Sequence, residues 1–215
     1  MKATVLALAV LFVLPVSFFP ASQSIQQETV LVTGFEPFNQ WDHNPSQEIT
    51  LALNDTKVGD AHIIGMVLPV TFDTSHHHLR KAIERYDPVA VIALGLDGSA
   101  HSIEVERMAV NLRHPSPLRF SLVNASGPLV RHTTLPADAI IAALHEEDIP
   151  VRQSWFAGLY VCNYVFYRLL GDAGQRSMPA GFIHVPPLPS QEPYGMELTT
   201  MLQSIRMAVN ITVAA

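Results

Sequence analysis

Cys162, the only cysteine among the 215 residues, is the side chain with the clearest potential for nucleophilic chemistry. It opens an apolar segment, residues 161–170, whose pattern predicts a helix. In the first turn of a helix the unpaired amides and the positive dipole end favour the thiolate, which is the nucleophilic form. Gly158 allows the chain to turn sharply just before it. Taken alone, Cys162 is equally well explained as a small buried core residue.

A general base for such a thiol is offered by His184, which ends the apolar run Gly181-Phe182-Ile183. This run predicts a strand, and binding sites in open parallel sheets form beyond the carboxyl ends of strands. A histidine there can reach a cysteine at a helix start and accept its proton. The chain has 10 histidines, and any one of them is more often structural than catalytic.

A carboxylate that could orient an imidazole is found in residues 103–111, where apolar and polar residues alternate. The alternation places Glu104 and Glu106 on one face of an extended segment. Either carboxylate, taken by itself, would more often be solvated. The spacing does not choose between the two.

The elements that must position these residues alternate between strands and helices. Asn44 followed by Pro45 is typical of a helix start, because the asparagine caps free amides and proline suits the first position. Such alternation predicts an α/β domain with a largely parallel sheet covered on both sides. Strands are expected at residues 29–32, 62–70, 89–94, 151–154 and 181–184, and helices at 45–53, 74–86, 137–147, 161–170 and 196–209.

The chain divides into an N-terminal segment, residues 1–24, and one domain, residues 25–215. Lys2, the apolar stretch 3–20 and the small residues that follow have the layout of a secretory signal. We expect export to the periplasm or the exterior, with retention as a membrane anchor as the alternative, since about 17 to 25 apolar residues can span a bilayer. A single cysteine excludes an intramolecular disulfide.

The charge pattern argues against nucleic acid as a partner, because the formal net charge is −6 and no basic run is present. His76, His77 and His78 are consecutive, so on a helix they point in different directions and cannot converge on one metal ion. We interpret them as a solvated helix face. The sequence therefore predicts no metal site and no organic cofactor.

Four separated segments together resemble the pyroglutamyl-peptidase I family of cysteine peptidases, also called pyrrolidone-carboxylate peptidases. The resemblance covers nearly all of the chain beyond the N-terminal segment, and the segments occur in the family's order. They are Thr33-Gly34-Phe35-Glu36-Pro37-Phe38 with Asn44-Pro45-Ser46, residues 95–111, residues 154–163, and Gly181-Phe182-Ile183-His184-Val185-Pro186.

The resemblance implies an α/β/α sandwich of three layers around a mostly parallel mixed sheet. It implies a triad with Cys162 as nucleophile and His184 as base, and its Glu-Arg pair falls on Glu106 and Arg107, which selects Glu106 over Glu104. The implied substrates are peptides with an N-terminal pyroglutamate. A homo-oligomer is also expected from the family.

The same resemblance gives the residues expected to hold the pyroglutamyl ring. In the family two phenylalanines enclose it, and they fall on Phe35 and Phe38. Tyr160 and Val161, next to the cysteine, are expected to complete the wall. A ring without a free α-amine suits such an apolar slot, because no ammonium has to be desolvated.

Three positions depart from the family's pattern. Leu96 stands where bacterial members commonly have a glutamine that helps to bind the lactam, Glu104 stands where a serine or threonine is usual, and Phe156 replaces a small or polar residue. These changes leave two alternatives open. One is a binding homologue with weak or no turnover, and the other is a peptidase or amidase for a different blocked N-terminus.

Overall fold

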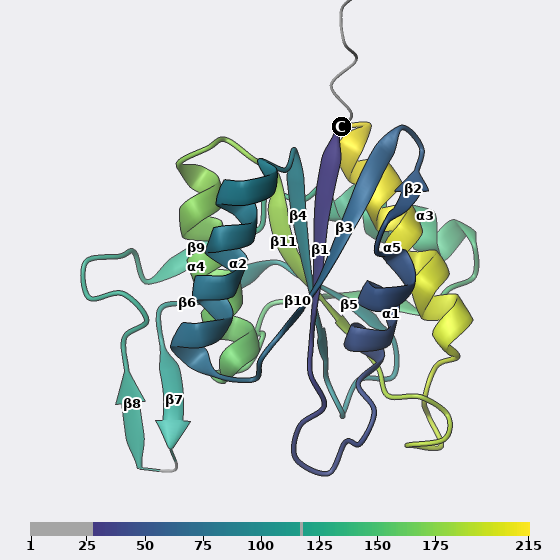
Figure 1. Cartoon of the computed structure of the whole chain (residues 1–215). Helices are drawn as coiled ribbons and strands as arrows, with labels where there is room; N and C mark the ends of the chain where they lie inside the picture. Colours follow the sequence, from purple (N-terminus) through teal and green to yellow (C-terminus); the bar gives the residue numbers. More distant parts are fainter. Residues whose placement is uncertain (1–27, 117) are drawn as a thin grey trace, which may run out of the picture.

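A computed structural model describes residues 28–116 and 118–215 (Figure 1). Within them a central seven-stranded sheet has the order β10-β5-β11-β4-β1-β3-β2, and two small sheets pair β6 with β9 and β7 with β8. The strands are β1 (Thr29–Phe35), β2 (Thr56–Val58), β3 (Ala61–Leu68), β4 (Ala90–Leu96), β5 (Ile103–Glu106), β6 (Met108–Val110), β7 (Arg113–Ser116), β8 (Arg119–Ser121), β9 (Val130–His132), β10 (Val151–Ser154) and β11 (Ala180–Val185). The helices are α1 (Pro45–Leu53), α2 (Phe72–Tyr86), α3 (Ala137–Glu146), α4 (Val161–Gly174) and α5 (Leu198–Val213).

The central sheet is mixed and mostly parallel, as predicted. β1 runs parallel to β3 and β4, β4 to β11, and β10 to β5. β5 is antiparallel to β11, and β2 is antiparallel to β3. Because β5 reverses direction beside β11, the carboxyl end of β5 lies away from the carboxyl ends of β11, β4, β1 and β3.

Helices cover both faces of the sheet and make the three-layer sandwich that was expected. Helices α2 and α4 lie on one face, while α1, α3 and α5 lie on the other (Figure 1). Each face has its own apolar core, with Leu79 and Phe166 buried on the first face and Ile49 and Ile205 on the second. The near-continuous burial of β4 follows from this cover on both sides.

The predicted helix start at Asn44 is present, because its side chain accepts a hydrogen bond from the amide of Ser46. Helix α2 begins at Phe72, two residues before the predicted start, and α5 runs four residues beyond its predicted end. The short strand β2 was missed. So were β7, β8 and β9, which pair within two small antiparallel ladders and bury little of their surface.

The interpretation of three solvated histidines is wrong for one of them. His77 and His78 are exposed, but His76 is 5% exposed and lies on the face of α2 that also buries Leu79. Its Nε2 is 2.7 Å from Oδ2 of Asp172 on α4. The face of the helix that packs against α4 therefore includes this histidine, which sequence spacing alone did not reveal.

The predicted N-terminal signal, residues 1–24, lies outside the described residues. Among residues 28–116 and 118–215, no helix combines the length and the apolar character needed to cross a membrane.

Candidate active site

Cys162 is the second residue of α4, so its thiol lies in the first turn of a helix as predicted. Tyr160 at the N-cap position makes no side-chain cap bond, which leaves the first amides of the helix available to another acceptor. Gly158 has a φ of 75°, a value that favours glycine, and makes the turn into the helix. The thiol is partly buried.

The sheet leaves room for the sulfur atom at Gly95 of β4. A Cβ atom at this position would lie 3.1 Å from Sγ of Cys162 and 2.9 Å from the ring of Phe182. Asn163 fixes the other side of the helix start, because its amide group bonds the backbone of Val110 at both N and O. The position of the thiol is therefore set by the sheet below and by β6 beside it.

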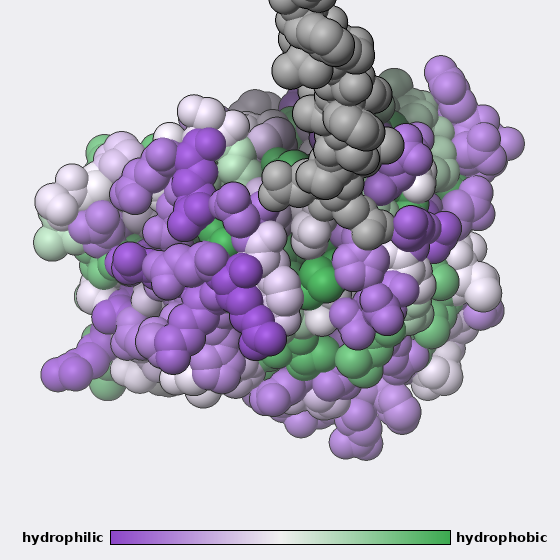
Figure 2. All heavy atoms as spheres, turned by 45° about the horizontal axis from the view of Figure 1, so that its top comes forward, coloured by the Kyte–Doolittle hydropathy of each residue, from purple (hydrophilic) through white to green (hydrophobic). Residues whose placement is uncertain are grey.

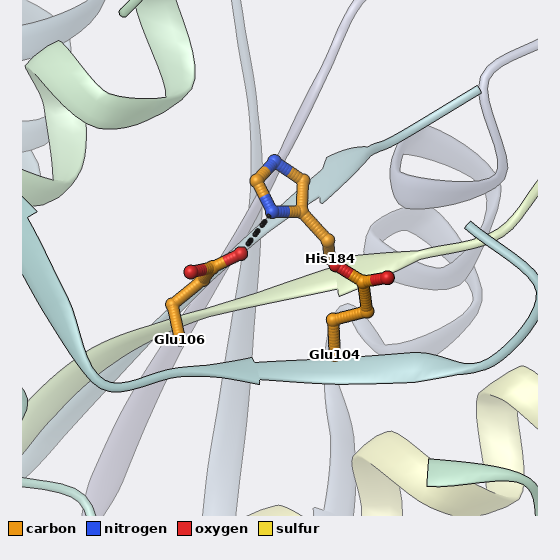
Figure 3. A group of neighbouring side chains, drawn as sticks. All are labelled: Glu104, Glu106 and His184. Carbon is orange, nitrogen blue, oxygen red and sulfur yellow. Dashed lines mark hydrogen bonds and ion pairs between the residues drawn. The ribbon is translucent and has the colours of Figure 1, made fainter. Parts of the chain in front are cut away.

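His184 on β11 and Glu106 on β5 form a buried pair. Nδ1 of His184 is 2.7 Å from Oε1 of Glu106, and the two residues are 5% and 0% exposed (Figure 3). The antiparallel register of β5 and β11, in which Ile183 faces Val105, brings the pair together. A carboxylate at this distance holds the ring in one orientation and fixes its tautomer.

The surroundings favour the protonated form of His184. Burial by itself would lower the pKa of the ring, but hydrogen bonding with Cys162 and Glu106 outweighs burial and raises that pKa well above its ordinary value. Cys162, His184 and Glu106 thus interact as one group. A thiol, a base and a group that orients the base are the components of nucleophilic catalysis.

Glu104 is buried as well, and its carboxylate has a different partner. Its Oε1 accepts a hydrogen bond of 2.8 Å from Nε of Arg152 on β10. One carboxylate oxygen from each glutamate and one ring nitrogen of His184 all lie within 4.8 Å of one another. Figure 3 draws the interaction between Glu106 and the ring, and draws none between Glu104 and the ring.

A pocket of about 230 Å³ opens beside these groups at the carboxyl ends of β1 and β4. It brings together all four residues predicted to hold the substrate ring with the predicted nucleophile and base, whereas Glu106 lies behind His184. The six are Phe35, Phe38, Tyr160, Val161, Cys162 and His184.

The aromatic side of the pocket is supported by the loop between β1 and α1. The amide of Phe35 donates to Oγ of Ser46, and Nδ2 of Asn44 donates to the carbonyl of Glu36. The helix cap that the sequence predicted therefore also fixes the loop. Phe38 lies in this loop and forms a β-bridge with Trp41.

Several pocket residues were not singled out from the sequence as parts of the site, among them Trp41, Val70 and Asp97. Trp41 could have been suspected, because it is an aromatic residue in the same turn-rich loop as Phe38. No local pattern in the sequence places Val70 or Asp97 in a site, because only the folding of segments far apart in the sequence brings them to the pocket.

Asp97 is the one carboxylate that lines this pocket within the described part of the chain. Its Oδ1 accepts hydrogen bonds of 2.8 Å from the amide and 2.7 Å from the hydroxyl of Ser99. Burial would raise the pKa of this carboxyl, but the bonds from Ser99 lower that pKa below its ordinary value. The group is therefore ionised at neutral pH.

The sequence model of the family described as pyroglutamyl peptidase matches residues 28–215. This chain belongs to the pyroglutamyl peptidase family. A pyrrolidone-carboxylate peptidase of Bacillus cereus is 35% identical over 201 residues, which cover 86% of this chain and 93% of that protein. One of Pyrococcus furiosus is 40% identical over 171 residues, which cover 75% and 82%.

Solved structures of pyroglutamyl peptidases superpose closely on the described fold. Pyrrolidone carboxyl peptidase from Thermococcus litoralis superposes with a TM-score of 0.83 at 32% identity, covering 87% of this chain and 94% of that one. Pyroglutamyl peptidase I from Bacillus amyloliquefaciens gives 0.83 at 30% identity, with 87% and 98% covered. The chain is thus a peptidase with the α/β fold of this family.

Proposed function

We propose that this protein removes N-terminal pyroglutamate from peptides, with Cys162 as nucleophile, His184 as general base and acid, and Glu106 as the group that orients the ring. The observation that carries this proposal is the buried bond between His184 and Glu106, with His184 lining the same pocket as the helix-start thiol. Family membership supplies the reaction class, and the geometry supports the assignment of roles.

In the proposed first step His184 takes the proton of Cys162, and the thiolate attacks the carbonyl carbon of the pyroglutamyl residue. The carbonyl oxygen becomes an oxyanion, for which the free amides at the start of α4 are suitable donors. His184 then gives its proton to the leaving nitrogen, the C–N bond breaks and a thioester remains. Water, deprotonated by His184, attacks the thioester and releases pyroglutamate and the thiol.

The shape and polarity of the pocket support a flat, uncharged ring as its occupant. Phe35 is 2% exposed and packs near Phe182, while Phe38 and Val161 add further apolar wall. Leu96 cannot bond the lactam as a glutamine would. One lost hydrogen bond is worth about 0.5 to 1.5 kcal/mol, so we expect binding to be weakened and the reaction preserved.

Asp97 offers the pocket an acceptor for the lactam N–H. Its Oδ1 is engaged by Ser99, and Oδ2 makes no hydrogen bond within the described residues. An ionised carboxylate forms a charge-assisted bond to an N–H donor, which is stronger than a neutral one. We therefore assign Asp97 part of the recognition that Leu96 cannot provide.

Hydrolysis of a pyroglutamyl fluorogenic amide tests this function. The wild-type chain should release the fluorophore in the presence of a reducing agent, and Cys162→Ser should fold normally and lose most of the rate. Hydrolysis would exclude the binding homologue without turnover. No hydrolysis of this amide, together with cleavage of another blocked amide, would favour the peptidase or amidase for a different N-terminus.

We also propose that residues 1–24 direct export and that the peptidase domain begins near residue 25. Mass spectrometry of the protein from its native host should find a new N-terminus between residues 22 and 27. Intact Met1 in a membrane fraction would instead support an anchor, and intact Met1 in a cytosolic fraction would contradict export.

A homo-oligomer is a further proposal, and the β7–β8 hairpin supports it. The hairpin projects from the body of the molecule (Figure 1), and Leu118 and Phe120 on it are 95% and 62% exposed. Exposed apolar side chains gathered in one place are typical of protein interfaces. Light scattering of the wild-type chain and of Leu118→Ser should show a loss of assembly in the variant.

A further inference from the structure

A second pocket, of about 290 Å³, lies between α2 and α4 and shares no lining residue with the catalytic pocket. The side of the molecule formed by these two helices carries mostly hydrophilic side chains (Figure 2). Four arginines reach this pocket, although the chain as a whole has a net charge of −6. Its charged lining consists of Arg80, Arg131, Arg168, Arg176, Glu84 and Asp172.

Each carboxylate of this pocket already has a partner. Oε1 of Glu84 is 3.0 Å from Nε of Arg80, one turn earlier on α2. Oδ2 of Asp172 is 2.7 Å from Nε2 of His76. Neither carboxylate is therefore paired with Arg131 on β9 or with Arg168 in the middle of α4.

Those two arginines, Arg131 and Arg168, make no salt bridge and no side-chain hydrogen bond with any described residue. Both are partly buried, and Nε of Arg131 is fully buried without a partner. A buried donor that lacks an acceptor costs free energy of the order of a lost hydrogen bond. The two guanidinium groups therefore keep donors that no described acceptor uses.

Arg131 is held in position even though it has no acceptor. Its guanidinium lies over the ring of Tyr167, 4.7 Å from the centroid, and the hydroxyl of Tyr167 donates to the carbonyl of Pro128. Gly171 provides the space that the guanidinium occupies, because a side chain there would collide with it. A preorganised guanidinium loses little entropy when it binds an oxyanion.

We propose that this pocket binds an oxyanion of the phosphate class, free or as a small monoester, through Arg131 and Arg168. Two planar guanidinium groups can each present paired N–H donors to such an anion, and the geometry of phosphate suits this fork. Arg80 and Arg176 also line the pocket, and each is paired with a carboxylate, Glu84 and Asp87 respectively. The volume accommodates a phosphate group with a small substituent.

Binding of inorganic phosphate, measured by calorimetry against chloride at equal ionic strength, tests the proposal. The wild-type chain should bind phosphate with one saturable site and show a higher melting temperature in its presence. Arg131→Gln and Arg168→Gln should each weaken binding roughly tenfold or more, because each removes charge-assisted bonds. Arg85→Gln, an arginine outside the pocket, is the matched control and should bind as the wild type does.

Acetate at the same concentration distinguishes the ligand class, and it should bind much more weakly than phosphate. Equal phosphate binding by wild type, Arg131→Gln and Arg168→Gln, or no saturable binding by the wild type, would overturn the proposal. Should Arg131→Gln fail to fold, Arg168→Gln decides. The two variants should hydrolyse the pyroglutamyl amide as the wild type does in phosphate-free buffer, since neither residue touches the catalytic pocket.

Discussion

Strand β5 carries two buried carboxylates, Glu104 and Glu106, whose surroundings differ. Glu106 is fully buried and bonds a histidine that can gain or lose a proton, whereas Glu104 is 2% exposed and bonds the guanidinium of Arg152, which is always charged. Both side chains lie on the same face of one strand. Strand geometry therefore makes the two glutamates equivalent, and only their partners separate them.

The partners also differ in their access to solvent. The side chain of Arg152 is 65% exposed, while that of His184 is 6% exposed. Charge on Glu104 is therefore balanced at the surface, at one edge of the sheet. Charge on Glu106 is balanced inside the protein, by a ring whose protonation depends on the thiol beside it. Only the Glu106 side can take part in a proton-transfer cycle.

Removal of the histidine should give the largest effect. His184→Ala deletes the base and leaves Glu106 buried without a partner, so we expect kcat/KM for a pyroglutamyl amide to fall by about 10⁴-fold or more. The comparison between the two glutamates would lose its basis if His184→Ala kept more than about a tenth of the activity. Circular dichroism of the variant provides the control for folding.

Glu106→Gln should cost less than His184→Ala but still about 10²- to 10⁴-fold, because the amide retains the shape and loses the charge that stabilises the imidazolium. The pH dependence of activity should also change in this variant. The carboxylate raises the pKa of His184, so its removal lowers that pKa, and the alkaline limb of the pH–rate profile should move to lower pH. An unchanged alkaline limb would contradict the role assigned to Glu106.

Asp97 extends the comparison to a third carboxylate, which faces the substrate. Asp97→Ala should lower kcat/KM for the lactam substrate by roughly tenfold and leave a lactone analogue, whose ring has oxygen in place of N–H, nearly unaffected. Asp97→Asn keeps an acceptor for Ser99 and should give an intermediate value. Equal losses of kcat/KM on the lactam and the lactone would show that Asp97 acts only through its hydrogen bonds with Ser99.

Glu104→Gln should give the smallest catalytic effect, within a few-fold of wild type, because Arg152 can be solvated once its partner is gone. The reverse substitution is informative about stability. Arg152→Gln leaves Glu104 buried without its cation and should lower the free energy of unfolding by about 1 to 3 kcal/mol. Urea denaturation of Glu104→Gln and Arg152→Gln measures the difference in stability. A larger loss of activity in Glu104→Gln than in Glu106→Gln would show that Glu104, and not Glu106, orients the histidine.

The sequence predicted the parallel core and the positions of Cys162 and His184, because strand ends and helix starts have local signatures. It did not distinguish Glu106 from Glu104 without the family resemblance, since alternation puts both on one face. The antiparallel pairing of β5 with β11 makes the choice, and it depends on contacts between residues far apart in sequence. Asp97 and the paired His76 were missed for the same reason.

The central claim is that the thiolate of Cys162 attacks a pyroglutamyl carbonyl held in the apolar pocket. Labelling with a chloromethyl ketone derived from pyroglutamate tests it most directly, because this reagent alkylates a nucleophile that lies within reach of the bound ring. We predict one label per chain, on the peptide that contains Cys162, with activity lost in proportion and a pyroglutamyl substrate slowing the reaction. Loss of activity with the label on any other residue, or full activity after Cys162 is labelled, would contradict the account.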